Sequence, residues 1–510
     1  MTAQPRKVLT PAQMGAVDRA TTEAGIPGIV LMENAAHRCV EYLQEKFAPL
    51  DSQRIVVVCG KGNNGGDGLA IARQLYTRFQ PRELRVVLIA DPAELKGDAA
   101  QNLAMLRAAG LQEYRDFGPE MRTATLVVDA VLGTGLSGPA KGDALNAIRE
   151  INQSFPLAKV FAVDLPSGLS GGSGAVSGEY VRADATVTFT APKICHAMPP
   201  AANLMGELRI APIGSPAAMY ENDHAINLAL VTPASIAPVF ARRVRDSNKG
   251  KYGHVLMVAG SRGKSGAAAM AGLAALRAGA GLVTVACPDA ALDAIAAHSP
   301  EVMSEPLPET NSIERIRHLA AQRTLAGIGP GIGTADETRK VVLQLFETLD
   351  KPMVVDADAL NCLAGKTWRG GQHLRVLTPH PGEMSRLTGL SIADVQGDRI
   401  ACTRALATER NVVVVLKGER TLIGFPDGRV WINPTGSPSM ATGGTGDILT
   451  GMTAGLLAQF PHDPDRAVAA AVYLHGLTGE IAARHLGEQP VIATDLLRFL
   501  GEGIRAITGS

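Results

Sequence analysis

Cysteine is scarce in this 510-residue chain, and its six cysteines never stand close enough together to form a C-x-x-C pair. This spacing argues against a zinc ribbon and against a small disulfide-stapled fold. Isolated cysteines are typical of proteins in a reducing compartment, so the sequence predicts a cytoplasmic protein. The cysteines are Cys39, Cys59, Cys195, Cys287, Cys362 and Cys402.

Net charge and aromatic residues are also lacking. Lysine plus arginine number 49, as do aspartate plus glutamate, so the formal net charge is zero. Without a basic excess, we expect no recognition of nucleic acid through phosphate contacts. Aromatic residues make up only 4% of the chain, whereas glycine numbers 55. This balance favours an α/β enzyme with tight strand-to-helix turns over a β-sandwich.

Long hydrophobic runs are absent as well. Residues 1–14 hold Arg6 and Lys7 but lack the apolar core of a signal peptide. The most apolar stretch, Ala267–Pro288, is rich in alanine and glycine and is interrupted by Arg277. That pattern is typical of a buried helix followed by a strand. We therefore expect neither a signal peptide nor a membrane span.

The chain does have a regular alternation of strand-like and helix-like segments, with 46% hydrophobic residues to build its cores. Such alternation is typical of parallel sheets covered by helices. It lapses across residues 212–250, which contain four prolines and a basic run. The sequence therefore predicts two α/β domains, residues 1–220 and residues 221–510.

The expected elements follow from this pattern. Thr10-Pro11 is expected to cap and begin the first helix. In the first domain, strands are expected at 54–58, 84–89, 126–128, 160–163, 185–189 and 208–211, and helices near 68–78, 98–109 and 144–152. In the second, strands are expected at 254–258, 282–286, 325–328, 353–355 and 412–416, and helices at 266–277, 335–349, 446–457 and 465–484.

A glycine-rich turn follows the strand expected at 54–58. It reads Cys59-Gly60-Lys61-Gly62-Asn63-Asn64-Gly65-Gly66-Asp67-Gly68. Such a turn exposes backbone N–H groups and the positive end of a helix, which suits a phosphate or a dinucleotide. Its spacing matches neither the G-x-G-x-x-G motif nor a Walker loop. A tight structural turn without a ligand is the alternative.

Polar side chains stand where strands of the first domain end. Asp129 is followed by the flexible segment Gly133–Pro139, and Asp164 by Pro166-Ser167-Gly168. Ligands of open parallel sheets bind outside the carboxyl ends of strands, so these side chains are expected to meet at one edge. Their oxygen atoms suit a hard cation such as potassium or magnesium. The set is Asn64, Asp67, Asp129, Asp164 and Ser167.

The second half contains a glycine run, Gly436–Gly451, that enters a helix with Asp447 in its first turn. The amides of Gly444–Asp447 and the helix N-terminus can form an anion hole for a transferred phosphoryl group. Asp447 is then placed to take the proton of an attacking hydroxyl. The alternative is an ordinary first-turn acid that complements the helix dipole.

Other segments of the second half add weaker signals. Lys417–Thr421 ends a strand-like run, although K-G-E is common on protein surfaces. His380 lies within T-P-H-P-G-E, although a lone histidine is often structural. Gly329–Gly333 forms another glycine-rich segment.

The motifs of the first half resemble those of the NAD(P)H-hydrate epimerases, over roughly residues 10–215. The resemblance implies a Rossmann-like fold, with Asp164 near the reacting ring as acid and base. It also implies a potassium ion on Asn64, Asp129 and Ser167. The implied substrate-binding residues are Asn63, Asn64, Gly65, Gly66, Asp67, Gly133, Thr134, Gly135, Leu136, Ser137, Gly138, Pro139 and Asp164.

The second half resembles the ribokinase superfamily in its G-x-G-D run, and the ADP-dependent NAD(P)H-hydrate dehydratases in T-P-H-P-G-E, over about residues 225–505. The resemblance implies a ribokinase-like α/β domain with Asp447 at the reacting hydroxyl. It places the substrate at Ala267, Gly331, His380 and Asp447. It places the adenine nucleotide, accompanied by magnesium, at Lys417, Gly418, Glu419, Arg420, Thr421 and Gly446.

Both resemblances imply one substrate, NADH or NADPH hydrated at C6 of the nicotinamide ring. The second domain would phosphorylate the 6-hydroxyl of one epimer and expel phosphate, while the first would interconvert the epimers. ADP is the expected co-substrate, with ATP as the other option, and a homo-oligomer is expected. The alternative is a kinase of vitamin-like alcohols fused to a non-catalytic Rossmann-like binding module.

Overall fold

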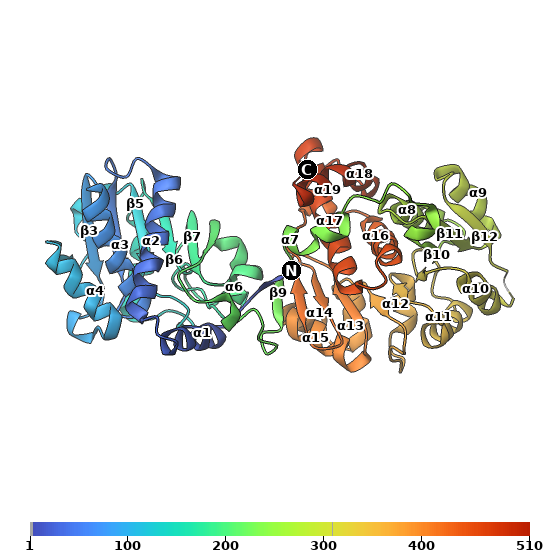
Figure 1. Cartoon of the computed structure of the whole chain (residues 1–510), viewed down its shortest axis with the longest axis horizontal. Coiled ribbons are helices and arrows are strands. Elements are labelled where there is room, and N and C mark those ends of the chain that lie inside the picture. The colour runs from blue at the N-terminus through green and yellow to red at the C-terminus, as the bar shows by residue number, and fades with distance from the viewer. Residues whose placement is uncertain (1–3, 309, 510) are drawn as a thin grey trace. The chain divides into compact units, whose positions relative to one another are not determined.

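The computed structural model describes residues 4–308 and 310–509 and divides the chain into two compact units. One unit is Lys7–Ile226, and the other is Asn227–Ser510 with Met1–Arg6. Each unit is a mainly parallel sheet flanked by helices (Figure 1). The predicted α/β class is therefore confirmed. Within the described residues, no helix has both the length and the hydropathy needed to cross a bilayer.

The first unit is built on a parallel sheet in the order β4-β3-β2-β5-β6-β7-β8. Its strands are β2 (Arg54–Cys59), β3 (Glu83–Leu88), β4 (Glu113–Tyr114), β5 (Leu126–Ala130), β6 (Lys159–Val163), β7 (Ala185–Phe189) and β8 (Glu207–Ala211). Its helices are α1 (Pro11–Glu23), α2 (Gly28–Phe47), α3 (Asn63–Phe79), α4 (Gly97–Ala108), α5 (Gly142–Gln153) and α6 (Ile194–Ala197). The chain leaves β2 toward β3 and returns to β5 on its other side, so the binding crevice of such sheets is expected between β2 and β5.

Two helix starts in this unit have clear local causes. Thr10 caps α1 as predicted, because its hydroxyl accepts from the Gln13 amide while the Gln13 side chain accepts from the Thr10 amide. The start of α3 differs from the prediction, since the helix begins at Asn63 rather than near Gly68. A Cβ on Gly65 would lie 1.8 Å from the Gly60 carbonyl oxygen. Glycine there lets the first helical turn lie directly against the end of β2.

The second unit contains a larger sheet, in the order β1-β9-β18-β17-β16-β15-β14-β13-β10-β11-β12. Its strands are β1 (Arg6–Lys7), β9 (Leu228–Leu230), β10 (His254–Val258), β11 (Leu282–Cys287), β12 (Met303–Pro306), β13 (Leu325–Ile328), β14 (Met353–Val355), β15 (Arg375–Leu377), β16 (Val413–Leu416), β17 (Leu422–Gly424) and β18 (Val430–Ile432). The β16–β17 and β17–β18 pairs are antiparallel, whereas the sequence pattern indicated parallel sheets and predicted no strand at β17 or β18. These strands have three or four residues, too few to show a hairpin in the hydrophobic pattern.

Helices cover this sheet, and the strand order again defines a crevice. The helices are α7 (Pro233–Ile236), α8 (Ser265–Arg277), α9 (Asp289–His298), α10 (Ser312–Ala321), α11 (Asp336–Thr348), α12 (Asp358–Leu363), α13 (Pro381–Thr388), α14 (Ile392–Gly397), α15 (Arg399–Arg410), α16 (Thr445–Gln459), α17 (Pro464–Leu486), α18 (Ala493–Arg498) and α19 (Leu500–Thr508). The chain passes from β10 to β11 and β12, then crosses back to β13 on the other side of β10. The segments after β10 and β13 therefore meet at the carboxyl edge, where the Gly260 amide donates to the Pro330 carbonyl at 2.7 Å.

Helix α16 lies unusually close to α8 because small residues face each other. A Cβ on Gly451 would lie 2.1 Å from the Ala271 carbonyl oxygen, and one on Gly455 would lie 2.4 Å from that of Ala275. The close approach buries most of α16 and fixes the position of its N-terminus. The glycines that follow the G-x-G-D run thus serve packing.

We predict that Gly451→Ala destabilises the second unit, because the added methyl group must displace backbone. Overpacking of this kind costs about 1–3 kcal/mol, measurable as a shift of the chemical denaturation midpoint. Gly397→Ala is the matched control, because Gly397 is also helical and a Cβ there meets no atom within 4 Å. Equal midpoints for the two variants would contradict the packing role of Gly451.

Candidate active sites

A cavity of about 960 Å³ opens at the switch point of the first unit. The turn after β2, the segment after β5 and the residue after β6 all contribute to its wall, together with α1 and α2. The sequence-predicted residues that line it are Asn63, Asn64, Asp67, Gly133, Thr134, Gly135, Leu136, Ser137 and Asp164. The structure therefore brings most of the predicted set to one cavity.

Four residues of the predicted binding set are not among those that line this cavity. Gly65 lies against the Gly60 backbone, and a Cβ on Gly66 would lie 2.8 Å from the Met32 side chain. Gly138 adopts a φ of 76°, and Pro139 lies next to Gly178. These four residues therefore pack against neighbouring segments or form turns next to the cavity wall.

Asp164 follows β6 and carries the most constrained carboxylate of the unit. Its backbone has a φ of 66°, in the left-handed region that is costly for a residue with a Cβ. The buried Lys193 ammonium donates to Asp164 Oδ1 at 2.8 Å, to the Thr188 hydroxyl at 2.8 Å and to the Phe189 carbonyl at 3.2 Å. Burial raises the pKa of Asp164, but Lys193, His196 and Thr188 together outweigh burial and hold that pKa below its usual range.

His196 fixes the backbone on either side of this ion pair. Its Nδ1 accepts from the Lys193 amide at 3.0 Å, so Nε2 carries the proton and donates to the Asp164 carbonyl at 2.9 Å. Burial lowers the pKa of His196 to about 4, so the ring is neutral near pH 7. His196 therefore holds Asp164 and Lys193 in place.

Asp67 lies on the same cavity wall but in the opposite electrostatic state. The residue is 9% exposed, and within the described residues no hydrogen bond or ion pair reaches its carboxyl group. Burial, with smaller contributions from Asp164 and Asp18, raises the pKa of Asp67 well above its usual value. The cavity thus combines an ionised carboxylate at Asp164 with a carboxyl group at Asp67 that favours its proton.

Two oxygen-bearing side chains, Asp129 and Ser167, meet at the ends of β5 and β6, and Asn64 lies near the segment that follows β5. The Ser167 hydroxyl donates to Asp129 Oδ1 at 2.6 Å and accepts from the Leu132 amide at 2.8 Å, while a Cβ on the next residue, Gly133, would lie 3.2 Å from the Asn64 side chain. Within the described residues, neither polar side-chain atom of Asn64 has a partner, although both are buried. Burial raises the pKa of Asp129 to about 6. The unpartnered Asn64 oxygen, with the Asp129 carboxylate and the Ser167 hydroxyl nearby in the chain fold, is a set of oxygen ligands that fits a cation such as potassium.

In the second unit, the segments after β10 and β13 bring Ala267 and Gly331 together. A Cβ on Gly331 would lie 3.3 Å from the Ala267 side chain, and the Ser261 hydroxyl donates to the Gly331 carbonyl at 2.7 Å. Gly331 has a φ of 68°, a conformation that favours glycine. These two predicted substrate residues therefore share one wall of the carboxyl edge.

Asp447 lies in the first turn of α16, whose N-cap Gly444 is left-handed and provides no side-chain cap. The N–H groups of this first turn face outward, as an anion hole requires. Burial raises the pKa of Asp447 to about 7, with further contributions from Asp356 and Asp358, while Lys417 lowers it. A carboxyl group with this pKa can exchange protons near neutral pH.

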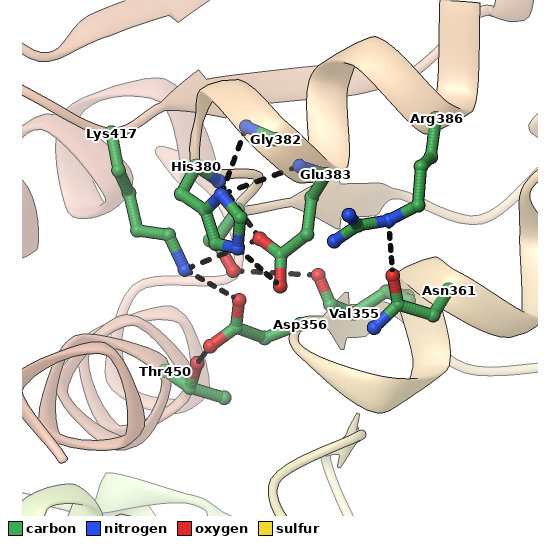
Figure 2. Close-up of polar contacts among 10 residues, drawn as sticks. Val355, Asp356, Asn361, His380, Gly382, Glu383, Arg386, Lys417 and Thr450 are labelled. Carbon is green, nitrogen blue, oxygen red and sulfur yellow. Dashed lines mark hydrogen bonds and ion pairs between the residues drawn. The ribbon is translucent and has the colours of Figure 1, made fainter. Parts of the chain in front are cut away.

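Asp356 connects this helix to the end of β16 (Figure 2). It follows β14, is 1% exposed, and accepts from the Lys417 ammonium at 2.8 Å through Oδ1. Its Oδ2 accepts from the Thr450 hydroxyl at 2.6 Å. One buried carboxylate therefore joins β14, β16 and α16.

His380 caps α13 beside the same cluster (Figure 2). Its Nδ1 accepts from the amides of Gly382 and Glu383, while the Glu383 carboxylate accepts from the His380 amide at 2.8 Å. Burial raises the pKa of Glu383 to about 7, although Lys417 lies 3.8 Å away. The His380 ring is half exposed, so its outer edge is accessible to a ligand.

The turn Lys417–Thr421 is supported from inside by Arg399. This buried arginine donates to the carbonyl groups of Leu416, Lys417 and Glu419. Gly418 has a φ of 134°, and a Cβ there would lie 3.1 Å from the Arg399 guanidinium. The backbone of this turn is therefore held rigidly at the carboxyl end of β16.

The sequence analysis missed five residues that organise these sites. Lys193 and His196 hold Asp164, and Asp356, Glu383 and Thr450 surround Lys417 and Asp447. Asp356 could have been found, because it stands directly after a strand-like run as Asp129 and Asp164 do. The lysine and histidine lie in ordinary segments with no comparable signal.

The fold and the sites define a two-unit α/β enzyme with one site at the carboxyl edge of each sheet. The C-terminal residues 255–500 match the family model described as NAD(P)H-hydrate dehydratase, and residues 28–195 match that of the YjeF-related protein N-terminus. A bifunctional NAD(P)H-hydrate repair enzyme of Moorella thermoacetica is 42% identical, with 97% of this chain and 96% of the relative covered. Its counterpart in Coxiella burnetii is 37% identical over 96% of this chain and 97% of the relative. The chain belongs to the family of bifunctional NAD(P)H-hydrate repair enzymes.

Solved structures support the assignment of the second unit. The ADP/ATP-dependent NAD(P)H-hydrate dehydratase of Bacillus subtilis, crystallised with ATP and Mg²⁺, is 33% identical and has a TM-score of 0.50. The match covers 55% of this chain and 98% of the Bacillus chain. A ribokinase-like superfamily protein of Enterococcus faecalis is 28% identical, also with a TM-score of 0.50, over 57% of this chain and 100% of that chain. The predicted ribokinase-like fold of the second unit is confirmed.

We predict that Lys193→Met strongly destabilises the first unit, because it leaves the buried Asp164 carboxylate without its cation. Breaking a buried pair in this way costs about 3–5 kcal/mol. Lys159→Met is the matched control, since Lys159 also meets a carboxylate at 2.8 Å, that of Asp184, but is exposed. Chemical denaturation of both variants checks the prediction, and a small loss for Lys193→Met would show that Asp164 does not depend on Lys193.

Proposed function

We propose that this protein restores NADH and NADPH that have been hydrated at C6 of the nicotinamide ring. The second unit dehydrates the S epimer with ADP or ATP, and the first interconverts the R and S epimers. The observation that carries this proposal is the presence, in one chain, of two carboxylate-bearing sites at the carboxyl edges of two sheets. Membership of the repair-enzyme family supports it, and the comparisons do not favour the alternative of a vitamin kinase with a non-catalytic module.

In the second site, the 6-hydroxyl of the substrate attacks the terminal phosphorus atom of the nucleotide, and Asp447 takes its proton. The bond from that phosphorus to the bridging oxygen breaks, releasing AMP from ADP or ADP from ATP. Phosphate then leaves C6 with the bonding electrons as the ring nitrogen forms a double bond to C6. Loss of a proton from C5 restores the reduced nicotinamide.

The ligands of the second site contact the residues that the sequence predicted. The substrate lies against Ala267, Gly331 and His380, and the nucleotide lies on Lys417–Thr421 and Gly446. Magnesium would accompany the nucleotide phosphates, with Glu383 as its protein carboxylate, and would neutralise their charge. Glu383 is suited to this role because its buried carboxylate accepts a hydrogen bond from the His380 amide and keeps oxygen lone pairs for a cation.

In the first site, Asp164 faces the nicotinamide ring and the residues after β2 and β5 hold the dinucleotide. Ionised Asp164 would stabilise positive charge that develops on the ring as C6 inverts. Asn64, Asp129 and Ser167 would hold potassium, which would contribute positive charge beside the bound phosphates. The active molecule is proposed to be a cytoplasmic homo-oligomer.

The direct test is a spectroscopic assay with a mixture of both NADHX epimers, magnesium and either ADP or ATP. We expect the absorbance of NADH to return for both epimers, and the nucleotide that works identifies the co-substrate. Asp164→Asn should leave only the R epimer unrepaired when spontaneous epimerisation is slow, because the second unit is untouched. Recovery of both epimers at the wild-type rate by Asp164→Asn would contradict the role of Asp164.

We also predict that dehydration depends on pH through Asp447. Its pKa of about 7 in the free protein means that the basic, ionised form is lost as the pH falls below 7. The kcat/KM for S-NADHX should therefore fall about tenfold per pH unit on the acid side. Asp447→Asn should lower kcat about 100-fold or more, and its kcat/KM should not show this fall at acidic pH. A fall that persists in Asp447→Asn would assign the titration to another group.

A further inference from the structure

The two buried lysines of the sites differ in how many of their hydrogen-bond donors are used. All three N–H groups of Lys193 have acceptors, at Asp164, Thr188 and Phe189. Lys417 donates to Asp356 at 2.8 Å, but Glu383 at 3.8 Å lies beyond hydrogen-bond distance. Within the described residues, the Lys417 ammonium therefore has donors left for a ligand.

The Lys417 ammonium lies beside the N-terminus of α16. A Cβ on Gly446 would lie 3.4 Å from Lys417 Nζ, so the ammonium is adjacent to the first turn of the helix. Lys417 also interacts electrostatically with Asp447 in that turn. The Lys417 side chain is 19% exposed, which leaves one side of it open. A phosphoryl group that accepts hydrogen bonds from the first N–H groups of α16 would therefore also contact this ammonium.

Asp356 fixes the distance between the ammonium and the helix (Figure 2). Its two oxygen atoms are held by different elements, Oδ1 by Lys417 at the end of β16 and Oδ2 by Thr450 in α16. Because the carboxylate is 1% exposed, no water competes for either contact. Movement of the lysine away from the helix would break one of the two bonds.

We propose that Lys417 is a catalytic residue whose ammonium binds the phosphoryl group during its transfer, and that Asp356 is a positioning residue that holds Lys417 at the N-terminus of α16. The inference rests on the proposed function of the second site. In this step the O6–P bond forms as the P–O bond to the nucleotide breaks, and Asp447 takes the hydroxyl proton. Lys417 keeps its proton throughout and offsets the negative charge that passes from the phosphoryl oxygens to the leaving group.

The first test compares kcat and KM of S-NADHX dehydration in single variants of the full-length protein. Lys417→Met should lower kcat about 100- to 1,000-fold, the usual effect of removing one group that stabilises developing charge. Lys417→Arg keeps the charge and should retain much more of the rate. Asp356→Asn should lower kcat about 100-fold through misplacement of Lys417, with a much smaller change in KM for S-NADHX. A KM effect without a kcat effect would overturn the catalytic role.

A double-variant cycle separates positioning from a general structural effect. If Asp356 acts through Lys417, the variant that carries both Asp356→Asn and Lys417→Met should be no slower than Lys417→Met alone, within about threefold. Additive losses would overturn the positioning role of Asp356. Thr450→Val removes only the second partner of Asp356 and should lower kcat about tenfold, the effect of weakening one hydrogen bond to a charged group. It serves as the test of positioning if Asp356→Asn fails to fold.

Asp465→Asn is the matched control. Asp465 Oδ2 forms an ion pair with Arg429 Nη2 at 2.6 Å in the same unit, but it lies outside the site. Its kcat should equal that of the wild type, and thermal melting should show that all variants are folded. Wild-type protein that restores NADH while Lys417→Met keeps the same kcat would overturn this inference alone. Wild-type protein that restores no NADH with either nucleotide would overturn the proposed function, and the inference with it.

Discussion

A carboxylate buried at the edge of a sheet is stable only when a cation or several hydrogen-bond donors meet it. Both units of this protein satisfy that constraint in the same way, with one lysine 2.8 Å from one aspartate at the carboxyl end of a strand. Asp164 meets Lys193 in the first unit, and Asp356 meets Lys417 in the second. The remaining groups of each site are arranged around this pair. In the first unit, all three N–H groups of Lys193 have acceptors, and the lysine fixes the carboxylate. In the second, the carboxylate fixes Lys417, which within the described residues has N–H donors left for a ligand.

In the described part of the chain, three other acids of the sites have no lysine at hydrogen-bond distance, and burial is the largest influence on their pKa values. Burial raises the pKa of Asp67 in the first unit, and that of Glu383 and Asp447, both to about 7, in the second. Groups perturbed in this way are common where protons are transferred. The first site therefore combines an ionised Asp164 with an Asp67 that favours its proton, and such a division suits acid–base chemistry.

Glycine and alanine set the geometry that these charges need. Gly65 lets α3 begin directly against the end of β2, and Gly451 lets α16 approach α8. In both units the helix that borders the site is thereby placed by backbone contact, with little freedom to shift. A small rigid displacement of either N-terminus would separate it from the carboxylate beside it, so the packing of small residues and the electrostatics of the sites are coupled.

The sequence by itself determined the α/β class, most strands of the two sheets and the strand-end acids Asp129 and Asp164, because periodicity and the position of a residue after a strand are local properties. It also predicted Asp447 as a site residue, because a glycine run before a helix leaves the N–H groups of the first turn open to an anion. Only the tertiary structure decided which lysine meets which acid. Lys193 and Asp164 are 29 residues apart, and Lys417 and Asp356 are 61 apart. Such pairs leave no periodic trace, because the order of strands in the sheet, rather than any local pattern, brings the two side chains together.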